Sequence, residues 1–337
     1  MFAPHKTTGE PPTMTSGDAS RLLSQWYLKN KRHLPWREHR DPYLIWISEV
    51  MLQQTTVQAV IPYYQRFIQK FPNLNALARA PIEDVIEMWA GLGYYSRARN
   101  LHRAAQAISK LNSFPRSYRD LIELPGFGDY TSRAVSSIAF DEPVGVVDGN
   151  VIRILSRLYG QHFQWWKSAD KKTLQDLSDQ MAMELTPSIV NQGMMELGAT
   201  ICTPTNPACP LCPWLKICKA RKQDLINHLP ARKPKKAGVM LLLDMELIFY
   251  KKQLALVENA DLPFLKKTLL PPIKSKQLSK KPAQFDFQHS ITHHQIYVRI
   301  STKVVRTPNK KLQWYPISDI AKVNPSSLIK KALSSIK

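Results

Sequence analysis

All four cysteines of this chain lie in one short stretch, and thiolates gathered in this way are a typical set of metal ligands. Six, two and five residues separate Cys202, Cys209, Cys212 and Cys218. A disulfide framework would normally spread its cysteines along a chain of 337 residues. Zinc sites usually contain two CxxC pairs, whereas only Cys209 and Cys212 form one here, so the spacing favours a [4Fe-4S] cluster over zinc.

Two carboxylates occupy contrasting surroundings. Glu49 stands in the almost wholly apolar stretch Trp46–Leu52, where burial would disfavour the charged form and suit a proton donor. Asp148 precedes a helical pattern that starts at Asn150; its ordinary role there is an N-cap, which would hold it ionised. Cleavage of an N-glycosidic bond needs such a pair, because one carboxyl protonates the leaving base and the other faces the positive charge developing on the sugar. The pattern permits these side chains to meet without requiring it.

The net charge indicates the class of partner. Lys and Arg number 47 against 26 Asp and Glu, which gives +21 and favours a polyanion such as nucleic acid. No apolar run approaches the roughly 20 residues needed to span a bilayer, and no signal peptide opens the chain. We therefore expect a cytoplasmic protein, in the cytosol or nucleoid of a bacterium, and no membrane partner.

A glycine-containing loop, Leu124–Gly128, lies between helical patterns at 117–123 and 129–140 and predicts a helix-hairpin-helix. Gly126 and Gly128 would let the backbone approach a ligand, and the amides that open the next helix can bind a phosphate oxygen. Such a loop grips a DNA backbone without reading bases. An ordinary corner between two helices is the alternative, and the positive charge favours DNA.

Breaks in the pattern divide the chain into four parts. We expect a flexible leader over 1–17, a helical region over 18–218, a basic linker over 219–236 and a smaller strand-containing domain over 237–337. Helical spacing of apolar residues covers 43–53, 57–70, 83–89, 97–110, 133–140, 150–159 and 171–185. Strands are predicted at 239–250, 253–257 and 295–305, and a closing helix at about 325–336.

The hairpin, Asp148 and the C-x6-C-x2-C-x5-C loop together resemble the endonuclease III superfamily of DNA glycosylases. Further strings are similar to its adenine-specific branch, the MutY family. They are LPWR at 34–37, SEVMLQQT at 48–55, GLGYYSRARN at 91–100, DGNV at 148–151 and MMELGATIC at 194–202. The match extends from about Leu22 to Cys218.

This resemblance implies a mainly α fold with a small α+β Nudix-like domain at the C-terminal end. Two helical subdomains are expected, one of six helices and one carrying the cluster, with the active site between them. The resemblance also implies that the four cysteines bind a [4Fe-4S] cluster, which orders a loop near the DNA backbone and does not catalyse. Lys216 and Lys219 around that loop would face phosphate.

The resemblance also implies catalytic roles. Glu49 would protonate adenine so that the base leaves neutral, and Asp148 would stabilise the sugar cation or attack it transiently. Asn150 would orient Asp148, and Tyr130 would hydrogen-bond near the pair. Bifunctional relatives carry a lysine at the position of Tyr130, where it forms a Schiff base with the sugar. A monofunctional enzyme that leaves an abasic site is therefore expected.

Further residues are expected at the DNA. The target base must leave the stack, and Gln54 and Tyr94 match family positions that wedge into the duplex beside it. Leu34–Arg37 would lie near the adenine pocket. In the C-terminal part, Phe287–His293 resembles a loop that recognises 8-oxoguanine, with Thr292 and His293 in the contacting places.

The C-terminal domain departs from the family pattern in one respect. Residues 251–285 lack the usual arginine-containing strand and tryptophan-containing stretch, and a lysine-rich run at 274–281 stands there instead. No pyrophosphatase signature of closely spaced glutamates is present. We expect a shortened domain that binds without catalysing and discriminates 8-oxoguanine from guanine less strongly than the family at large.

The expected function is monofunctional removal of adenine mispaired with 8-oxoguanine or guanine in double-stranded DNA. A monomer should suffice, and repair enzymes that act on abasic sites would follow it. One alternative is a mismatch-specific thymine or uracil glycosylase, although that branch generally lacks the extra domain. Another is a non-catalytic iron–sulfur sensor that binds DNA, which would have no chemical need of both Glu49 and Asp148.

Overall fold

The computed structural model describes residues 16–234, 237–266, 268–324 and 326–336. It divides into two compact units, Met1–Lys233 and Pro234–Lys337. The leader expected at 1–17 falls almost wholly outside the described residues. Within the described ranges, no helix is long and apolar enough to cross a membrane.

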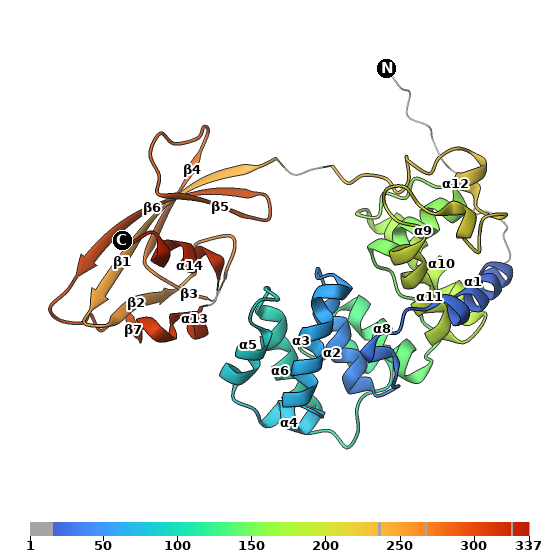
Figure 1. The fold of residues 1–337 in the computed structure, drawn as a ribbon, viewed down its shortest axis with the longest axis horizontal. Helices are drawn as coiled ribbons and strands as arrows, with labels where there is room; N and C mark the ends of the chain where they lie inside the picture. The colour runs from blue at the N-terminus through green and yellow to red at the C-terminus, as the bar shows by residue number, and fades with distance from the viewer. Residues whose placement is uncertain (1–15, 235–236, 267, 325, 337) are drawn as a thin grey trace. The chain divides into compact units, whose positions relative to one another are not determined.

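The first unit is built of helices (Figure 1). They are α1 (Ser16–Asn30), α2 (Pro42–Leu52), α3 (Val57–Lys70), α4 (Leu74–Arg79), α5 (Ile82–Trp89), α6 (Ser96–Ile108), α7 (Tyr118–Ile122), α8 (Asp129–Phe140), α9 (Gly149–Tyr159), α10 (Ser168–Met183), α11 (Pro187–Thr200) and α12 (Lys219–Lys222). Short 3-10 turns cover Pro35–Arg37 and Cys209–Leu211. The helical segments predicted from apolar spacing are confirmed, with ends that differ by a few residues.

The helices form two groups, α2 to α8 in one and α1 with α9 to α12 in the other (Figure 1). Helix α11 packs against both α8 and α9 and so joins the groups. Polar residues that precede the helices fix where several of them begin, because their side chains accept hydrogen bonds from the first turn. Asp41 caps α2 in this way, Asn73 caps α4 and Ser117 caps α7.

Helix α2 runs through the core of its group. Tyr43 and the residues from Ile45 to Met51 are buried, which explains why the sequence there is apolar nearly throughout. Its Trp46 stacks on Phe127 of the hairpin, with ring centroids 5.1 Å apart. The predicted helix-hairpin-helix is confirmed as α7, a turn and α8. Through Phe127, that hairpin is held against the helix that carries Glu49.

The basic segment expected to act as a linker is partly packed onto the first unit. It opens with α12, and further along Arg157 donates from Nε to the carbonyl of Leu229 at 3.1 Å. The Trp165 indole also donates to the carbonyl of Ala231, at 3.3 Å. The division between the units therefore falls after Lys233, near the end of this segment.

The second unit is a mixed sheet with two helices. Its elements are β1 (Val239–Tyr250), β2 (Gln253–Glu258), β3 (Leu269–Leu270), β4 (Ile273–Leu278), β5 (Phe287–Ile291), β6 (His294–Val304), β7 (Gln313–Pro316), a 3-10 turn (Ile317–Asp319), α13 (Ile320–Val323) and α14 (Ser327–Ser334). The strand order is β3-β2-β1-β6-β5, with β4 paired to β1 and β7 paired to β2. Strands β1 and β6 are parallel, and the other pairs are antiparallel.

One face of this sheet forms the second core. Leu243, Met245 and Ile296 are fully buried there with Leu328 and Ile329 of α14. Alternate residues of β1 point to this face, as the period of two in a strand requires. The strands predicted at 239–250, 253–257 and 295–305 and the helix near the end of the chain are confirmed.

Two segments of the second unit differ from expectation. The lysine-rich run contains β4, which pairs with β1 from Met245↔Ile273 to Met240↔Leu278. The expected recognition loop is shorter than predicted, because Phe287–Ile291 is β5 and only Thr292 and His293 form the turn into β6. Strand β4 depends on a partner distant in sequence, whereas β5 pairs with β6 across the two-residue turn. In both cases the pairing outweighs the local polar composition.

Candidate active site

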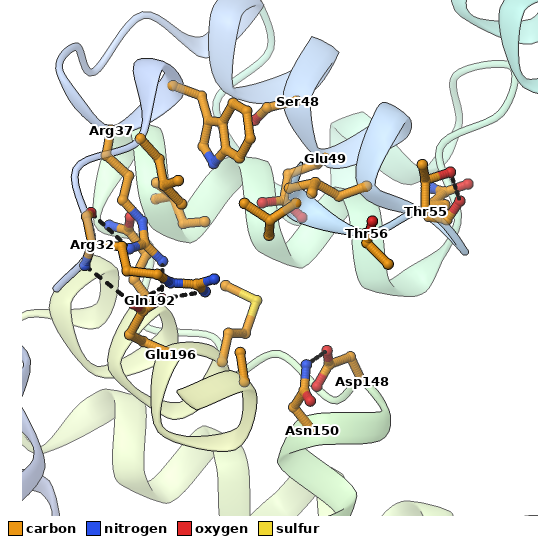
Figure 2. A pocket seen from close by; sticks show the side chains of 18 of the residues that line it. Arg32, Arg37, Ser48, Glu49, Thr55, Thr56, Asp148, Asn150, Gln192 and Glu196 are labelled. Carbon is orange, nitrogen blue, oxygen red and sulfur yellow. Dashed lines mark hydrogen bonds and ion pairs between the residues drawn. The ribbon is translucent and has the colours of Figure 1, made fainter. Parts of the chain in front are cut away.

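A cavity of about 880 Å³ lies between the two helical groups of the first unit. Helices α2, α8, α9 and α11 contribute to its wall. Among its lining residues are six that the sequence singled out: Arg37, Glu49, Gln54, Tyr130, Asp148 and Asn150. Figure 2 shows Glu49 on one side of the cavity and Asp148 with Asn150 on the other. The fold therefore brings together carboxylates that are far apart in sequence.

Glu49 is buried and has one hydrogen-bond donor at its carboxylate. The Tyr130 hydroxyl donates to Oε2 of Glu49 at 2.9 Å and also lies 3.1 Å from Sδ of Met195. Burial raises the pKa of Glu49 to about 7; the Tyr130 hydrogen bond opposes this rise and the nearby Asp148 adds to it. Burial raises the pKa of Tyr130 well above its usual range, so its hydroxyl stays protonated. Near neutral pH a large fraction of Glu49 can hold a proton.

Asp148 begins α9 and is held by two hydrogen bonds. Its Oδ1 accepts from the Val151 amide at 2.7 Å, which is the expected N-cap, and its Oδ2 accepts from Nδ2 of Asn150 at 2.9 Å. Burial raises the pKa of Asp148, while the bonds from Val151 and Asn150 act in the opposite direction. The bonds fix the orientation of the carboxylate toward the cavity.

Arg153 hydrogen-bonds to the side-chain oxygen of Asn150, whose amide nitrogen bonds to Asp148. The sequence did not predict this contact. Nη2 of Arg153 donates to Oδ1 of Asn150 at 2.8 Å and to the carbonyl of Gly198 at 2.6 Å, and its Nε donates to the carbonyl of Cys202 at 2.7 Å. A continuous chain of hydrogen bonds thus connects Asp148 to the backbone of the first cysteine.

A buried carboxylate on α11 forms a second polar wall of the cavity. Glu196 accepts from Nε and Nη2 of Arg32 at 2.7 and 2.8 Å and from Nη2 of Arg37 at 2.8 Å (Figure 2). Burial favours its neutral form, but the hydrogen bonds from both arginines lower the pKa of Glu196 below its ordinary value. Sequence reasoning assigned it no role. The available signal was a lone acid in the apolar stretch MMELGA, the same signal that identified Glu49.

Three of the residues predicted to contact DNA share an unusual backbone. Gln54, Tyr94 and Thr292 all have left-handed conformations, with φ of 58°, 48° and 55°. All three side chains are exposed. Non-glycine residues adopt this conformation at a cost in free energy, and they concentrate at functional sites. Of the three, Gln54 lines the cavity, Tyr94 lies outside its lining, and Thr292 belongs to the second unit with the exposed His293.

The hairpin glycines meet different requirements. Gly126 has φ of 80°, and a Cβ there would lie 2.5 Å from Cβ of Asn100, so only glycine fits. Gly128 is exposed at the start of α8, and a Cβ there would meet nothing within 4 Å. The open backbone at α8 could therefore approach a phosphate, although neither glycine lines the cavity.

The four cysteines form no disulfide among the described residues, and each is half-buried in the loop that follows α11. Burial raises the pKa of Cys212 to about 12, and the other three thiols lie near enough to add to the rise. Nη1 of Arg157 lies 3.3 Å from Sγ of Cys202. Within the described ranges, no three His, Cys, Asp or Glu side chains are gathered as the ligands of one metal ion would be.

Comparison with known proteins identifies relatives of both the sequence and the fold. Residues 47–183 match the family model of the HhH-GPD superfamily base excision DNA repair protein. The chain is 37% identical over 245 residues to an adenine DNA glycosylase of Buchnera aphidicola from Schizaphis graminum, covering 72% of this chain and 71% of the relative. It is 32% identical over 348 residues to the enzyme of that name from the Acyrthosiphon pisum strain, covering 96% and 99%.

Solved structures show the same helical fold. A thermostable thymine-DNA glycosylase superposes with a TM-score of 0.57 at 27% identity, covering 62% of this chain and 97% of that one. An endonuclease III in a non-covalent complex with DNA superposes with a TM-score of 0.51 at 25% identity, covering 63% and 99%. Each superposition covers a part of this chain that is similar in length to its helical unit.

Proposed function

The chain belongs to the adenine DNA glycosylases of the HhH-GPD superfamily, and we propose that its substrate is adenine opposite 8-oxoguanine in duplex DNA. As a member, it is a hydrolase that cleaves the N-glycosyl bond of adenine. One observation carries the assignment of the active site: Glu49, hydrogen-bonded to Tyr130, faces Asp148 across a cavity large enough for a flipped nucleotide. This arrangement supports acid-assisted cleavage of the bond between adenine and its sugar.

Glu49 and Asp148 divide the chemistry between them. Protonated Glu49 donates its proton to a ring nitrogen of adenine, and the electron pair of the breaking C1′–N9 bond moves onto the base. The sugar is left as an oxocarbenium ion, which the carboxylate of Asp148 stabilises. Water adds at C1′ and gives up one proton, which restores the protonated form of Glu49 through solvent, so an abasic site and neutral adenine remain. Tyr130 cannot form a Schiff base, so strand cleavage by this enzyme should be slight.

Arg37 and Glu196 supply the polar side of the base pocket. The carboxylate of Glu196 is fully buried and accepts four hydrogen bonds from Arg32 and Arg37, so it fixes the orientation of Arg37, which offers donors to the base. Gln54 at the rim of the cavity and Tyr94 on its own exposed turn would enter the duplex beside the extruded nucleotide. The glycines of the hairpin would hold the DNA backbone.

Cys202, Cys209, Cys212 and Cys218 fit a [4Fe-4S] cluster better than a zinc ion. Zinc sites usually contain two CxxC pairs, and this chain has one, at Cys209 and Cys212. The four thiols lie near enough to influence one another electrostatically, as the ligands of one cluster in one loop would. When bound, the cluster would order the loop beside exposed Lys216, which can face phosphate.

Metal analysis tests this assignment. The purified protein should contain about four iron atoms and about four acid-labile sulfides per chain. Cys212→Ser should lose both and unfold at a lower temperature, whereas Ser301→Ala, an exposed change in the other unit, should keep the wild-type content. One zinc per chain in place of iron would overturn the assignment.

The second unit is proposed to act as a shortened Nudix-like reader of 8-oxoguanine. Thr292 and His293 form an exposed turn between β5 and β6, and the Thr292 backbone is left-handed. A hydroxyl and an imidazole at the tip of a sheet offer both donors and acceptors to a modified base. Lys274 and Lys276 on the exposed strand β4 add positive charge to this unit.

Base release from three duplexes tests the substrate. Under single-turnover conditions, adenine should leave faster opposite 8-oxoguanine than opposite guanine, and thymine opposite guanine should not leave.

Changing Thr292 and His293 together to alanine should slow adenine release opposite 8-oxoguanine by about tenfold, because a recognition hydrogen bond is lost, and should spare release opposite guanine. The matched control, Thr302→Ala on β6, should change neither rate. Equal wild-type rates on both adenine duplexes would reject the lesion reader, and release of thymine alone would reject the adenine assignment.

A further inference from the structure

Arg97, the second residue of α6, joins two loops that are far apart in sequence. Its Nη1 donates to the carbonyls of Val50, Met51 and Gln53 at 2.7, 3.2 and 2.6 Å. Its Nη2 donates to the carbonyls of Leu92 and Gly93 at 3.3 and 3.4 Å. All five acceptors are backbone carbonyl oxygens, so the guanidinium holds the backbone of both loops in place.

The first loop is the end of α2. The last carbonyls of a helix have no partner inside it, and here Nη1 of Arg97 satisfies three oxygens at and just before the turn into Gln54. A positive charge at a helix C-terminus is also favourable for the helix dipole. The next residue, Gln54, has a φ of 58°. Arg97 therefore supports the backbone where Gln54 adopts its left-handed conformation.

The second loop carries Tyr94, whose φ is 48°. The Arg97 amide donates to the Tyr94 carbonyl at 2.8 Å, and the guanidinium lies 5.5 Å from the ring centroids of both Tyr94 and Trp89. The Trp89 indole donates to the carbonyl of Gly93 at 3.2 Å. The Tyr94 loop is therefore anchored to the buried Trp89. Arg97 connects this anchored loop to the end of α2.

A third contact ties the same region to the hairpin. Nε2 of Gln53 donates to Oγ1 of Thr131 in α8 at 3.1 Å. A small cavity beside Arg97 is also lined by Gln53, Asn100 and Gly126. The two left-handed turns and the hairpin thus meet around one guanidinium.

We infer that Arg97 is a positioning residue that holds the Gln54 and Tyr94 turns as one rigid unit for base extrusion. This inference rests on the proposed function, in which both side chains enter the duplex. Arg97 governs the flipping of the base and not the chemistry at Glu49. Lysine cannot replace it, because a single ammonium group lacks the planar fork that reaches both loops.

Rates on two substrates separate the flipping of the base from the chemical step. With adenine opposite 8-oxoguanine, Arg97→Gln should lower the single-turnover rate constant about 30-fold, since misplaced wedge residues extrude the base poorly. With adenine opposite an abasic-site analogue, where the base is already unpaired, the loss should stay below about threefold. The matched control is Arg103→Gln, which removes the same charge from an exposed position of α6 and should match the wild type on both substrates.

Extrusion can also be measured with chemistry blocked. In an Asp148→Asn background, 2-aminopurine at the target position should fluoresce less with Arg97→Gln than with Arg97 intact. If Arg97→Gln does not fold, Arg97→Lys should show the same two-substrate difference. Equal losses on both substrates, or unchanged fluorescence, would overturn the inference. Failure of the wild type to release adenine would instead reject the proposed function, and the fluorescence comparison would still decide the role of Arg97.

Discussion

Asp148→Asn should lower the single-turnover rate constant for adenine release by about 10³-fold or more, because the sugar cation would lose the charge that faces it. Asparagine is as good an N-cap as aspartate, so the bond to the Val151 amide and the start of α9 should persist. The measurement is base release with enzyme in excess, on adenine opposite 8-oxoguanine, together with a thermal unfolding curve.

The control for this variant is the same substitution at another helix start. Asp41 caps α2 by accepting from the Tyr43 amide at 2.8 Å, so Asp41→Asn makes the same chemical change outside the cavity. It should keep the wild-type rate. DNA affinity of Asp148→Asn should be undiminished, since a negative charge near the DNA is removed. A rate within tenfold of the wild type would mean that Asp148 serves only as a helix cap.

Local patterns in the sequence predicted much of the helical unit. The helices follow apolar spacing, and the hairpin follows from two glycines between two such segments. Gly126 shows why that motif is reliable, since a Cβ would meet Asn100 and the backbone is left-handed. Each of these features depends on a few neighbouring residues, which a sequence displays directly.

The meeting of side chains across the cavity could not be read in the same way. Glu49 and Asp148 belong to different helical groups, and the packing of α11 against α8 and α9 helps to bring those groups together. Glu196 had the same apolar surroundings as Glu49, but its partners Arg32 and Arg37 are more than 150 residues away. An acid in an apolar stretch is thus a sign of burial, while its protonation depends on partners that the fold supplies.

The second unit illustrates the same limit for strands. Strand β4 has exposed lysines, so no alternation of apolar residues marks it, and its pairing with β1 alone makes it a strand. The left-handed backbone of Thr292 was also hidden, because a β-branched residue is among the least expected at positive φ. Nonlocal strand pairing and local backbone strain are therefore the two properties that only the structure could reveal.

Glu49→Gln should lower the rate constant by at least about 10²-fold, because the amide cannot donate the proton that the leaving base needs. In the wild type the same requirement sets the pH dependence. Burial raises the pKa of Glu49 to about 7, so the rate should be level below that pH and fall about tenfold per unit above it. The rate of the variant should lack this dependence. A wild-type rate that rises through pH 7 would show that Glu49 acts as a base.

The same substitution should stabilise the protein. In the unfolded chain Glu49 titrates near its ordinary value, so its protonated form favours folding at low pH and that contribution is lost as pH rises through about 7. Above pH 7, Glu49→Gln should therefore gain on the order of 3 kcal/mol in unfolding free energy, and below about pH 4 the gain should vanish.

Glu196→Gln provides the opposite case. Hydrogen bonds from Arg32 and Arg37 lower the pKa of Glu196, and the neutral amide would leave both arginines without their charged partner. It should lose stability at neutral pH. If the two variants changed stability in the same direction, the electrostatics assigned to this cavity would be wrong, since the fold disfavours the charged form of Glu49 and favours the charged form of Glu196.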